Sequence, residues 1–131
     1  MSKTYSLTNR TIIPIWSNVP FYLPAVIAIA KGLIWYGLLI ALAASVSLYY
    51  HLTKETQLAK TDKFLAYSVI AANLYVFYLT GFRQPYFAIA LAFVAVAFYF
   101  FLTGKEHKYD VHHGLWHLSS VVITLMCVLA Y

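Results

Sequence analysis

The sequence predicts an all-α integral membrane protein, a bundle of about five transmembrane helices, and three observations support this. First, 63% of the 131 residues are apolar and only 10% are charged, whereas soluble domains average about 45–50% and about 25%. Second, the apolar residues form five segments of 17 to 20 residues between polar breaks, close to the roughly 20 residues that cross a bilayer. Third, backbone groups in hydrocarbon must hydrogen-bond within the chain, so the segments are helices.

The five segments make a single transmembrane domain. The expected spans are residues 12–30, 33–52, 64–80, 86–102 and 113–131. Pro14, Pro20 and Pro24 each remove a helical donor from the first span, so we expect it to be kinked or partly interfacial. The breaks between spans are short, so consecutive helices must run antiparallel.

Basic residues gather on one side of the expected bundle. Five crossings place the N-terminus and the loops 53–63 and 103–112 on one face, which carries Lys3, Arg10, Lys54, Lys60, Lys63, Lys105 and Lys108. The opposite face carries only Lys31 and Arg83. The positive-inside rule therefore places the N-terminus and both longer loops in the cytoplasm, and the C-terminus on the other side. Because these charges flank apolar runs and form no basic face, we expect no nucleic acid partner.

Five polar side chains stand where hydrocarbon should exclude them, and each needs a reason. The second span ends with Ser47 and His51, the fifth begins with His113 and His117, and Asp62 precedes the third. Residues four apart lie on one face of a helix, so the members of each pair point the same way. The antiparallel order brings these three helix ends to one membrane boundary, the cytoplasmic one. We therefore expect the five side chains to converge there.

Three imidazoles with one open coordination position are typical of a catalytic zinc ion. The chain has a single cysteine, so it lacks the thiolates of a structural zinc site, and it has too few oxygen ligands for calcium. Asp62 could accept the proton of the attacking water or orient a ligating imidazole. The Ser47 hydroxyl could donate to the oxyanion that forms on an amide or ester carbonyl.

Each of these residues also has an ordinary structural interpretation. Alone, His51 is typical of an interfacial helix end, Asp62 of a helix N-cap, and Ser47 of a small residue between packed helices. The conjunction of all five groups on one side favours a site over these separate interpretations.

The remaining polar residues have simpler expected roles. Asn73 lies in the middle of the third span, where it should hydrogen-bond a neighbouring helix. His107 and His112 are expected in the loop before the last helix, and Asp110 at the cap of that helix. Cys127 is expected to pack.

The order and spacing of the candidate residues resemble the CREST superfamily of membrane metal hydrolases, which includes alkaline ceramidases, progestin/adipoQ receptors and myomaker-like proteins. The resemblance rests on Ser47-x3-His51, on Asp62 eleven residues after that histidine, and on His113-x3-His117 in the last helix. Residues 16–24 are also similar to the start of the first helix in ceramidase-like and myomaker-like members. Together these matches cover roughly residues 15–63 and 110–131.

This resemblance implies that His51, His113 and His117 bind Zn²⁺, that Asp62 is the catalytic aspartate and that Ser47 lies near the zinc-bound water. It also implies a membrane lipid as substrate, because family members hydrolyse lipid amides such as ceramides. The family typically has seven helices, so five would be a reduced version of that architecture, and a homo-oligomer could replace the missing pair. The acidic calcium ligands of ceramidases have no counterpart in residues 1–24, which contain no Asp or Glu.

The sequence thus predicts a zinc-dependent intramembrane hydrolase of a lipid amide or ester. One alternative is a non-enzymatic, zinc-stabilised protein that binds lipid or remodels membranes, as in the myomaker-like branch. Another is a b-type haem protein with one axial histidine from each of two helices. The haem alternative leaves the pair on the last helix unexplained, because haem needs only one ligand from that helix.

Overall fold

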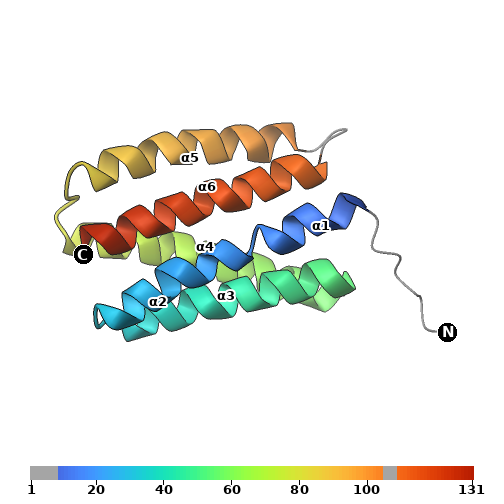
Figure 1. The fold of residues 1–131 in the computed structure, drawn as a ribbon, viewed down its shortest axis with the longest axis horizontal. Coiled ribbons are helices and arrows are strands. Elements are labelled where there is room, and N and C mark those ends of the chain that lie inside the picture. Colours follow the sequence, from blue (N-terminus) through green and yellow to red (C-terminus); the bar gives the residue numbers. More distant parts are fainter. Residues whose placement is uncertain (1–8, 105–108) are drawn as a thin grey trace.

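The computed structural model is entirely helical within the residues that it describes, 9–104 and 109–131. Its elements are α1 (Asn9–Trp16), η1 (Val19–Phe21), α2 (Tyr22–Ala30), α3 (Ile34–Thr53), α4 (Thr56–Leu79), α5 (Tyr86–Thr103) and α6 (Tyr109–Ala130) (Figure 1). Consecutive long helices run antiparallel, and α1 begins at the opposite end of the bundle from the end of α6. The predicted fold class is confirmed. Lys3, Lys105, His107 and Lys108 lie outside the described residues.

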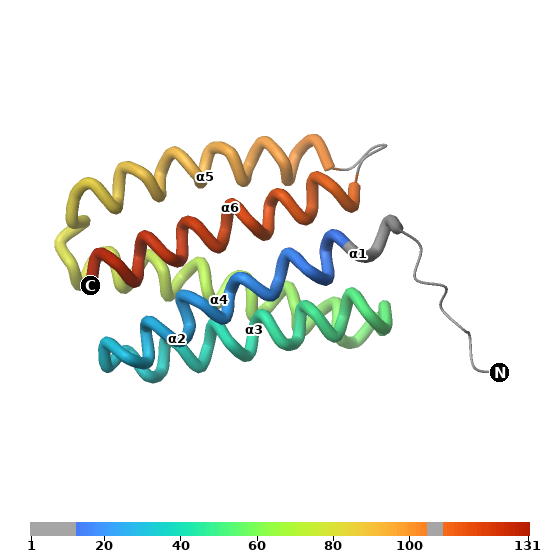
Figure 2. The backbone as a smooth tube through the Cα atoms, viewed as in Figure 1, coloured from blue at the N-terminus to red at the C-terminus, as the bar shows by residue number. Residues whose placement is uncertain are grey.

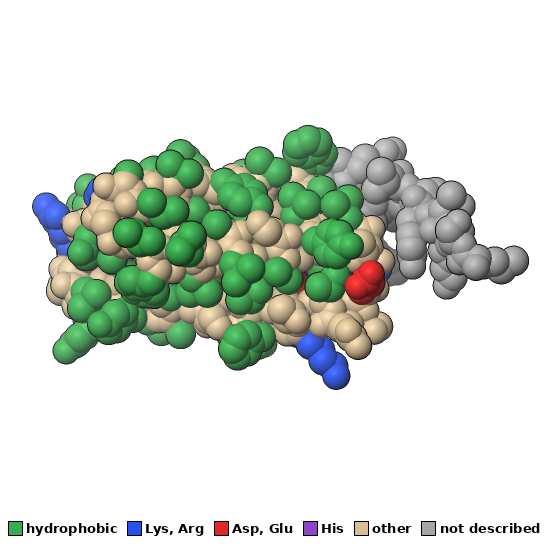
Figure 3. All heavy atoms as spheres, turned by 90° about the horizontal axis from the view of Figure 1, so that it is seen from below, with side chains coloured by type: hydrophobic (Ala, Val, Ile, Leu, Met, Phe, Trp, Pro, Cys, Tyr) green, Lys and Arg blue, Asp and Glu red, His purple; other side chains and the backbone are tan. Residues whose placement is uncertain are grey.

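Four segments are long and apolar enough to cross a membrane, which indicates a multi-pass membrane protein. They are Ile13–Ala30, Ile34–Thr53, Tyr86–Thr103 and Tyr109–Ala130. Hydrophobic side chains spread along the whole face drawn in Figure 3, and Lys and Arg lie near its two ends. α4, which covers the third expected span, is not among the four, because its first turns carry charged side chains and Asn73 lies further along it.

Prolines break the first pass, as the sequence predicts. α1 contains Pro14 and ends at Trp16, and the short helix η1, with Pro20 inside it, leads into α2. Figure 2 shows that these three pieces form one continuous pass along the bundle. They pack against α3 and α6, so the kinked pass forms one wall of the structure.

The prediction of a loop over residues 53–63 is wrong. α3 ends at Thr53, Lys54 follows in the left-handed conformation with φ 56°, and α4 already begins at Thr56. Residues 56–63 include neither Gly nor Pro, and Gln57, Leu58 and Ala59 are good helix formers. The helix therefore begins before the apolar segment that marks it in the sequence. Asp62 consequently lies inside α4, and the N-cap interpretation of this residue is wrong because Glu55 occupies the N-cap position.

The last helix also starts earlier than expected, at Tyr109. The loop position predicted for His112 is therefore wrong. Thr103 donates its hydroxyl hydrogen to the Tyr99 carbonyl at 2.7 Å, so the 2.8 Å contact between its oxygen and His112 Nδ1 is donated by the imidazole. This bond ties the end of α5 to the start of α6.

A buried polar network crosses the middle of the bundle and confirms the role predicted for Asn73. The Tyr36 hydroxyl on α3 donates to Asn73 Oδ1. Asn73 Nδ2 donates to Thr124 Oγ1 on α6 at 3.3 Å, and the Cys127 thiol donates to the Asn73 carbonyl at 3.3 Å. Each such bond between membrane helices contributes about 0.6–2 kcal/mol. The network therefore fixes the relative heights of α3, α4 and α6, the helices that carry the candidate site.

Candidate metal centre

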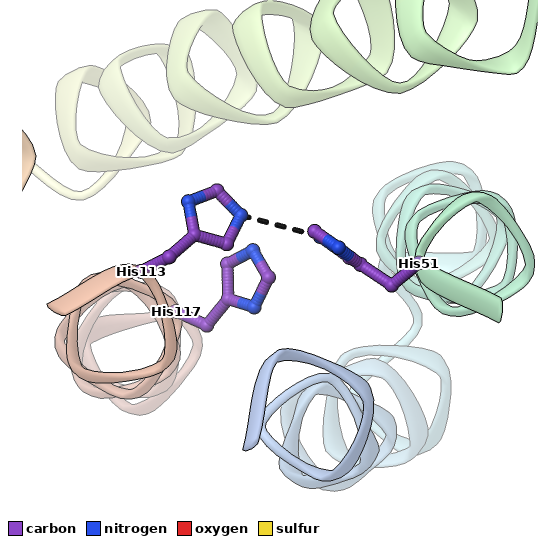
Figure 4. Close-up of side chains that lie close together, drawn as sticks. All are labelled: His51, His113 and His117. Carbon is purple, nitrogen blue, oxygen red and sulfur yellow. Dashed lines mark hydrogen bonds between the residues drawn. The ribbon is translucent and has the colours of Figure 1, made fainter. Parts of the chain in front are cut away.

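Three histidines from two helices meet at one end of the bundle, as the sequence predicts. His51 lies in the last turn of α3, and His113 and His117 lie one turn apart near the start of α6 (Figure 4). Their ligand nitrogens all lie within 4.8 Å of one another, and His51 Nε2 and His113 Nε2 are 3.2 Å apart. His51 is only 2% exposed and His117 only 4%. His51 and His117 are thus buried and His113 is half-buried, and buried polar groups of this kind are expected to have partners.

Helix packing places the α6 pair against the first pass. Gly114 lies between the two histidines of α6, and a Cβ there would come within 2.4 Å of Ile13 Cγ2 on α1. Glycine thus allows α1 and α6 to approach closely beside His113 and His117. α3 packs against α1 as well, which brings His51 to the same point from the other side.

The arrangement fits a divalent metal ion with imidazole ligands. Tetrahedral zinc with Zn–N distances of about 2.0–2.1 Å needs ligand nitrogens roughly 3.4 Å apart, and the shortest separation here is 3.2 Å. The ring of His51 contacts those of His113 and His117 edge-on, with centroids 4.9 and 5.5 Å away. A porphyrin cannot pass between rings in direct contact, so the geometry argues against haem.

Aromatic side chains surround the three imidazoles. Tyr109 stacks on His113 with ring centroids 5.0 Å apart, and Trp116 lies 5.3 Å from His113. Tyr50 lies 5.1 Å from His51. These rings pack around the imidazoles and lower the local polarity, which strengthens electrostatic interactions between them.

Asp62 and Ser47 are brought together, and Ser47 lies one helical turn from His51. Ser47 is buried one turn before His51 on α3, and its hydroxyl hydrogen-bonds the Asp62 carboxylate on α4. Burial raises the pKa of Asp62, while the bond from Ser47 and the positive charges of Lys54 and Lys63 oppose that rise. A carboxylate with a raised pKa is suited to accept a proton near neutral pH.

Lys54 is a neighbour of the cluster that the sequence marked only as a membrane-flanking charge. Its Nζ lies 3.2 Å from His51 Nδ1 and 5.4 Å from the centre of the Tyr50 ring. Burial lowers the pKa of Lys54, and the carboxylates of Asp110 and Asp62 partly offset this effect. Lys54 follows the last turn of α3, three residues after His51, a spacing that places neighbouring side chains side by side.

Ser17 is a second neighbour that sequence reasoning missed. It follows α1, is 5% exposed, and its Oγ lies 2.8 Å from His117 Nδ1. Ser17 and Asn18 belong to the stretch that supports the family resemblance, but no spacing in the sequence relates them to the histidines. The position of the kinked first pass brings Ser17 to His117.

Comparison with protein-family models, with curated proteins and with solved structures finds no match to this chain. The CREST resemblance therefore stays a prediction. The structure shows a helical membrane protein with a buried three-histidine cluster that could hold a metal ion.

Proposed function

We propose that this protein is a zinc-dependent intramembrane hydrolase that cleaves an amide or ester bond of a membrane lipid. The observation that carries the proposal is the cluster of His51, His113 and His117, with nitrogens within 4.8 Å of one another. Three neutral donors leave a coordination position for water, as in catalytic zinc sites, whereas structural sites are closed by four protein ligands.

In this proposal His51, His113 and His117 hold the metal, and bound zinc would supply hydroxide at neutral pH by lowering the pKa of its water to about 7. Asp62 accepts the proton of the attacking water, and its burial favours the protonated form that follows. The proton then passes to the leaving amine or alcohol, so the products are a fatty acid and that amine or alcohol. Protonation of Asp62 releases the Ser47 hydroxyl, which donates to the oxygen of the substrate carbonyl.

The same order of serine, aspartate and histidines in CREST hydrolases supports this assignment over a purely structural site. The location at a helix end also suits lipid hydrolysis, because acyl chains reach it from the bilayer and water from the boundary. We further propose that this boundary is cytoplasmic, on the distribution of Lys and Arg.

The test is fatty acid release by the purified protein, reconstituted in lipid nanodiscs with zinc and offered ceramide, other lipid amides and lipid esters. The wild type should release fatty acid, and His117→Ala should not. Ser119→Ala is the matched control, since Ser119 is buried on the same helix and, among the described residues, donates to the Leu115 carbonyl of its own helix. A wild type that holds zinc yet cleaves none of these lipids would contradict the hydrolase and favour the non-enzymatic alternative.

A further inference from the structure

We propose that Ser17 is a positioning residue of the metal centre, which holds the His117 imidazole with its proton on Nδ1 and its Nε2 lone pair directed toward His51 and His113. Figure 4 shows the corresponding orientation: one ring nitrogen of His117 points between the other two histidines, and the other points away from them. This inference rests on the metal-binding part of the proposed function and is independent of lipid hydrolysis.

The hydrogen count at Ser17 fixes the direction of its bonds. The hydroxyl carries one hydrogen, which it donates to the Pro14 carbonyl at 3.0 Å. Its 2.8 Å contact with His117 Nδ1 must then be donated by the imidazole. That contact therefore requires the proton on Nδ1, which leaves Nε2 free to bind a metal.

The end of α1 makes the Pro14 carbonyl available for this role. In a regular helix the amide of Asn18 would bond to it, but that amide bonds the Ile15 carbonyl instead, at 3.2 Å. Side chains replace the missing donor: Asn18 Nδ2 donates to the Pro14 carbonyl at 2.9 Å, alongside the Ser17 hydroxyl. Asn18 is 1% exposed, so the acceptor is held in a closed, fully bonded turn.

Metal-binding histidines commonly donate their second ring N–H to a fixed acceptor, and loss of that acceptor typically weakens metal binding 10–100-fold. Ser17 supplies this acceptor for His117 from the turn that follows α1. The first pass of the chain would thus complete the metal centre without contributing a ligand.

The experiment compares the full-length wild type with Ser17→Ala, Ser17→Thr and Ser119→Ala. Zinc affinity is measured by competition with a chromophoric chelator, and the ¹⁵N shifts of the His117 ring are recorded without added metal. Ser17→Ala should bind zinc about 10–100-fold more weakly and lose the strict preference for a proton on Nδ1. Ser17→Thr, which keeps the hydroxyl, and Ser119→Ala should resemble the wild type.

Two results would overturn the inference. One is a Ser17→Ala protein with wild-type zinc affinity, and the other is a wild-type His117 with its proton on Nε2. The ¹⁵N shifts of His117 are measured on the wild type, so the test remains even if Ser17→Ala fails to fold. A wild type that binds no zinc would instead refute the proposed function, while the ring shifts still decide what Ser17 does to His117.

Discussion

Asp62→Asn separates the metal-binding role of the site from its proposed chemistry. The substitution keeps the shape of the side chain but removes the negative charge of the carboxylate, which accepts the hydrogen bond from Ser47. Zinc content should be unchanged, because the three histidines are untouched. Fatty acid release should fall about 10²–10⁴-fold, the usual contribution of a general base. At about 1.36 kcal/mol per tenfold, that loss raises the barrier by roughly 2.7–5.5 kcal/mol.

The folding stability of Asp62→Asn, unlike its activity, should be unchanged or slightly higher than that of the wild type. Burial raises the pKa of Asp62 in the folded state above its ordinary value of 3.8. At pH values between 3.8 and this raised pKa, the folded state therefore binds more protons than the unfolded state. Stability contributed by this group is therefore lost as pH rises through that window, and the ionised carboxylate costs stability at neutral pH. Asp62→Asn should leave the protein as stable as the wild type or stabilise it by less than about 1 kcal/mol, since solvent screens this partly exposed group.

The assay combines zinc analysis, thermal unfolding and the pH dependence of kcat/KM on one lipid substrate. In the wild type kcat/KM should fall as pH drops through the raised pKa of Asp62, because a base must be ionised to accept a proton. Asp110→Asn is the control, a carboxylate that also lies near Lys54 but belongs to the first turn of α6. Undiminished turnover in Asp62→Asn with full zinc would refute the general-base role.

Two further variants test the surroundings of the site and the packing of the helices. Lys54→Met should tighten zinc binding severalfold. The reason is that Lys54 contacts the lone pair of His51 Nδ1, and this nitrogen must carry a proton when His51 Nε2 binds the metal. Weaker zinc binding of Lys54→Met in chelator competition would show instead that Lys54 supports the site. Gly37→Ala should lower the unfolding midpoint, at a cost of about 1–3 kcal/mol, because a Cβ would lie 2.6 Å from the Ala25 carbonyl oxygen on α2; an unchanged midpoint would contradict the close α2–α3 approach.

The histidine cluster was predictable because it depends on rules that act along the chain. The i, i+4 spacing puts His113 and His117 on one face, and the antiparallel order of helices brings the end of α3 to the start of α6. Asn73 was predictable for a similar reason, since a polar amide in the middle of a span must find a partner on another helix.

Other features depend on geometry that no local pattern encodes. The early start of α4 escaped prediction because a helix that continues outside hydrocarbon carries no apolar signal. The Ser17–His117 contact joins residues 100 positions apart and depends on the bend and rotation that the prolines give the first pass. Lys54 ends α3 in a left-handed backbone conformation, and a lysine gives no sequence signal for that conformation.

The most direct test of the central claim is zinc K-edge X-ray absorption of the purified protein, with metal content measured on the same sample. We predict one zinc per chain, bound by three imidazole nitrogens and one further light-atom ligand at about 2.0–2.1 Å, and lost in His117→Ala. A preparation without stoichiometric zinc, or a spectrum that does not require three imidazoles, would contradict the account.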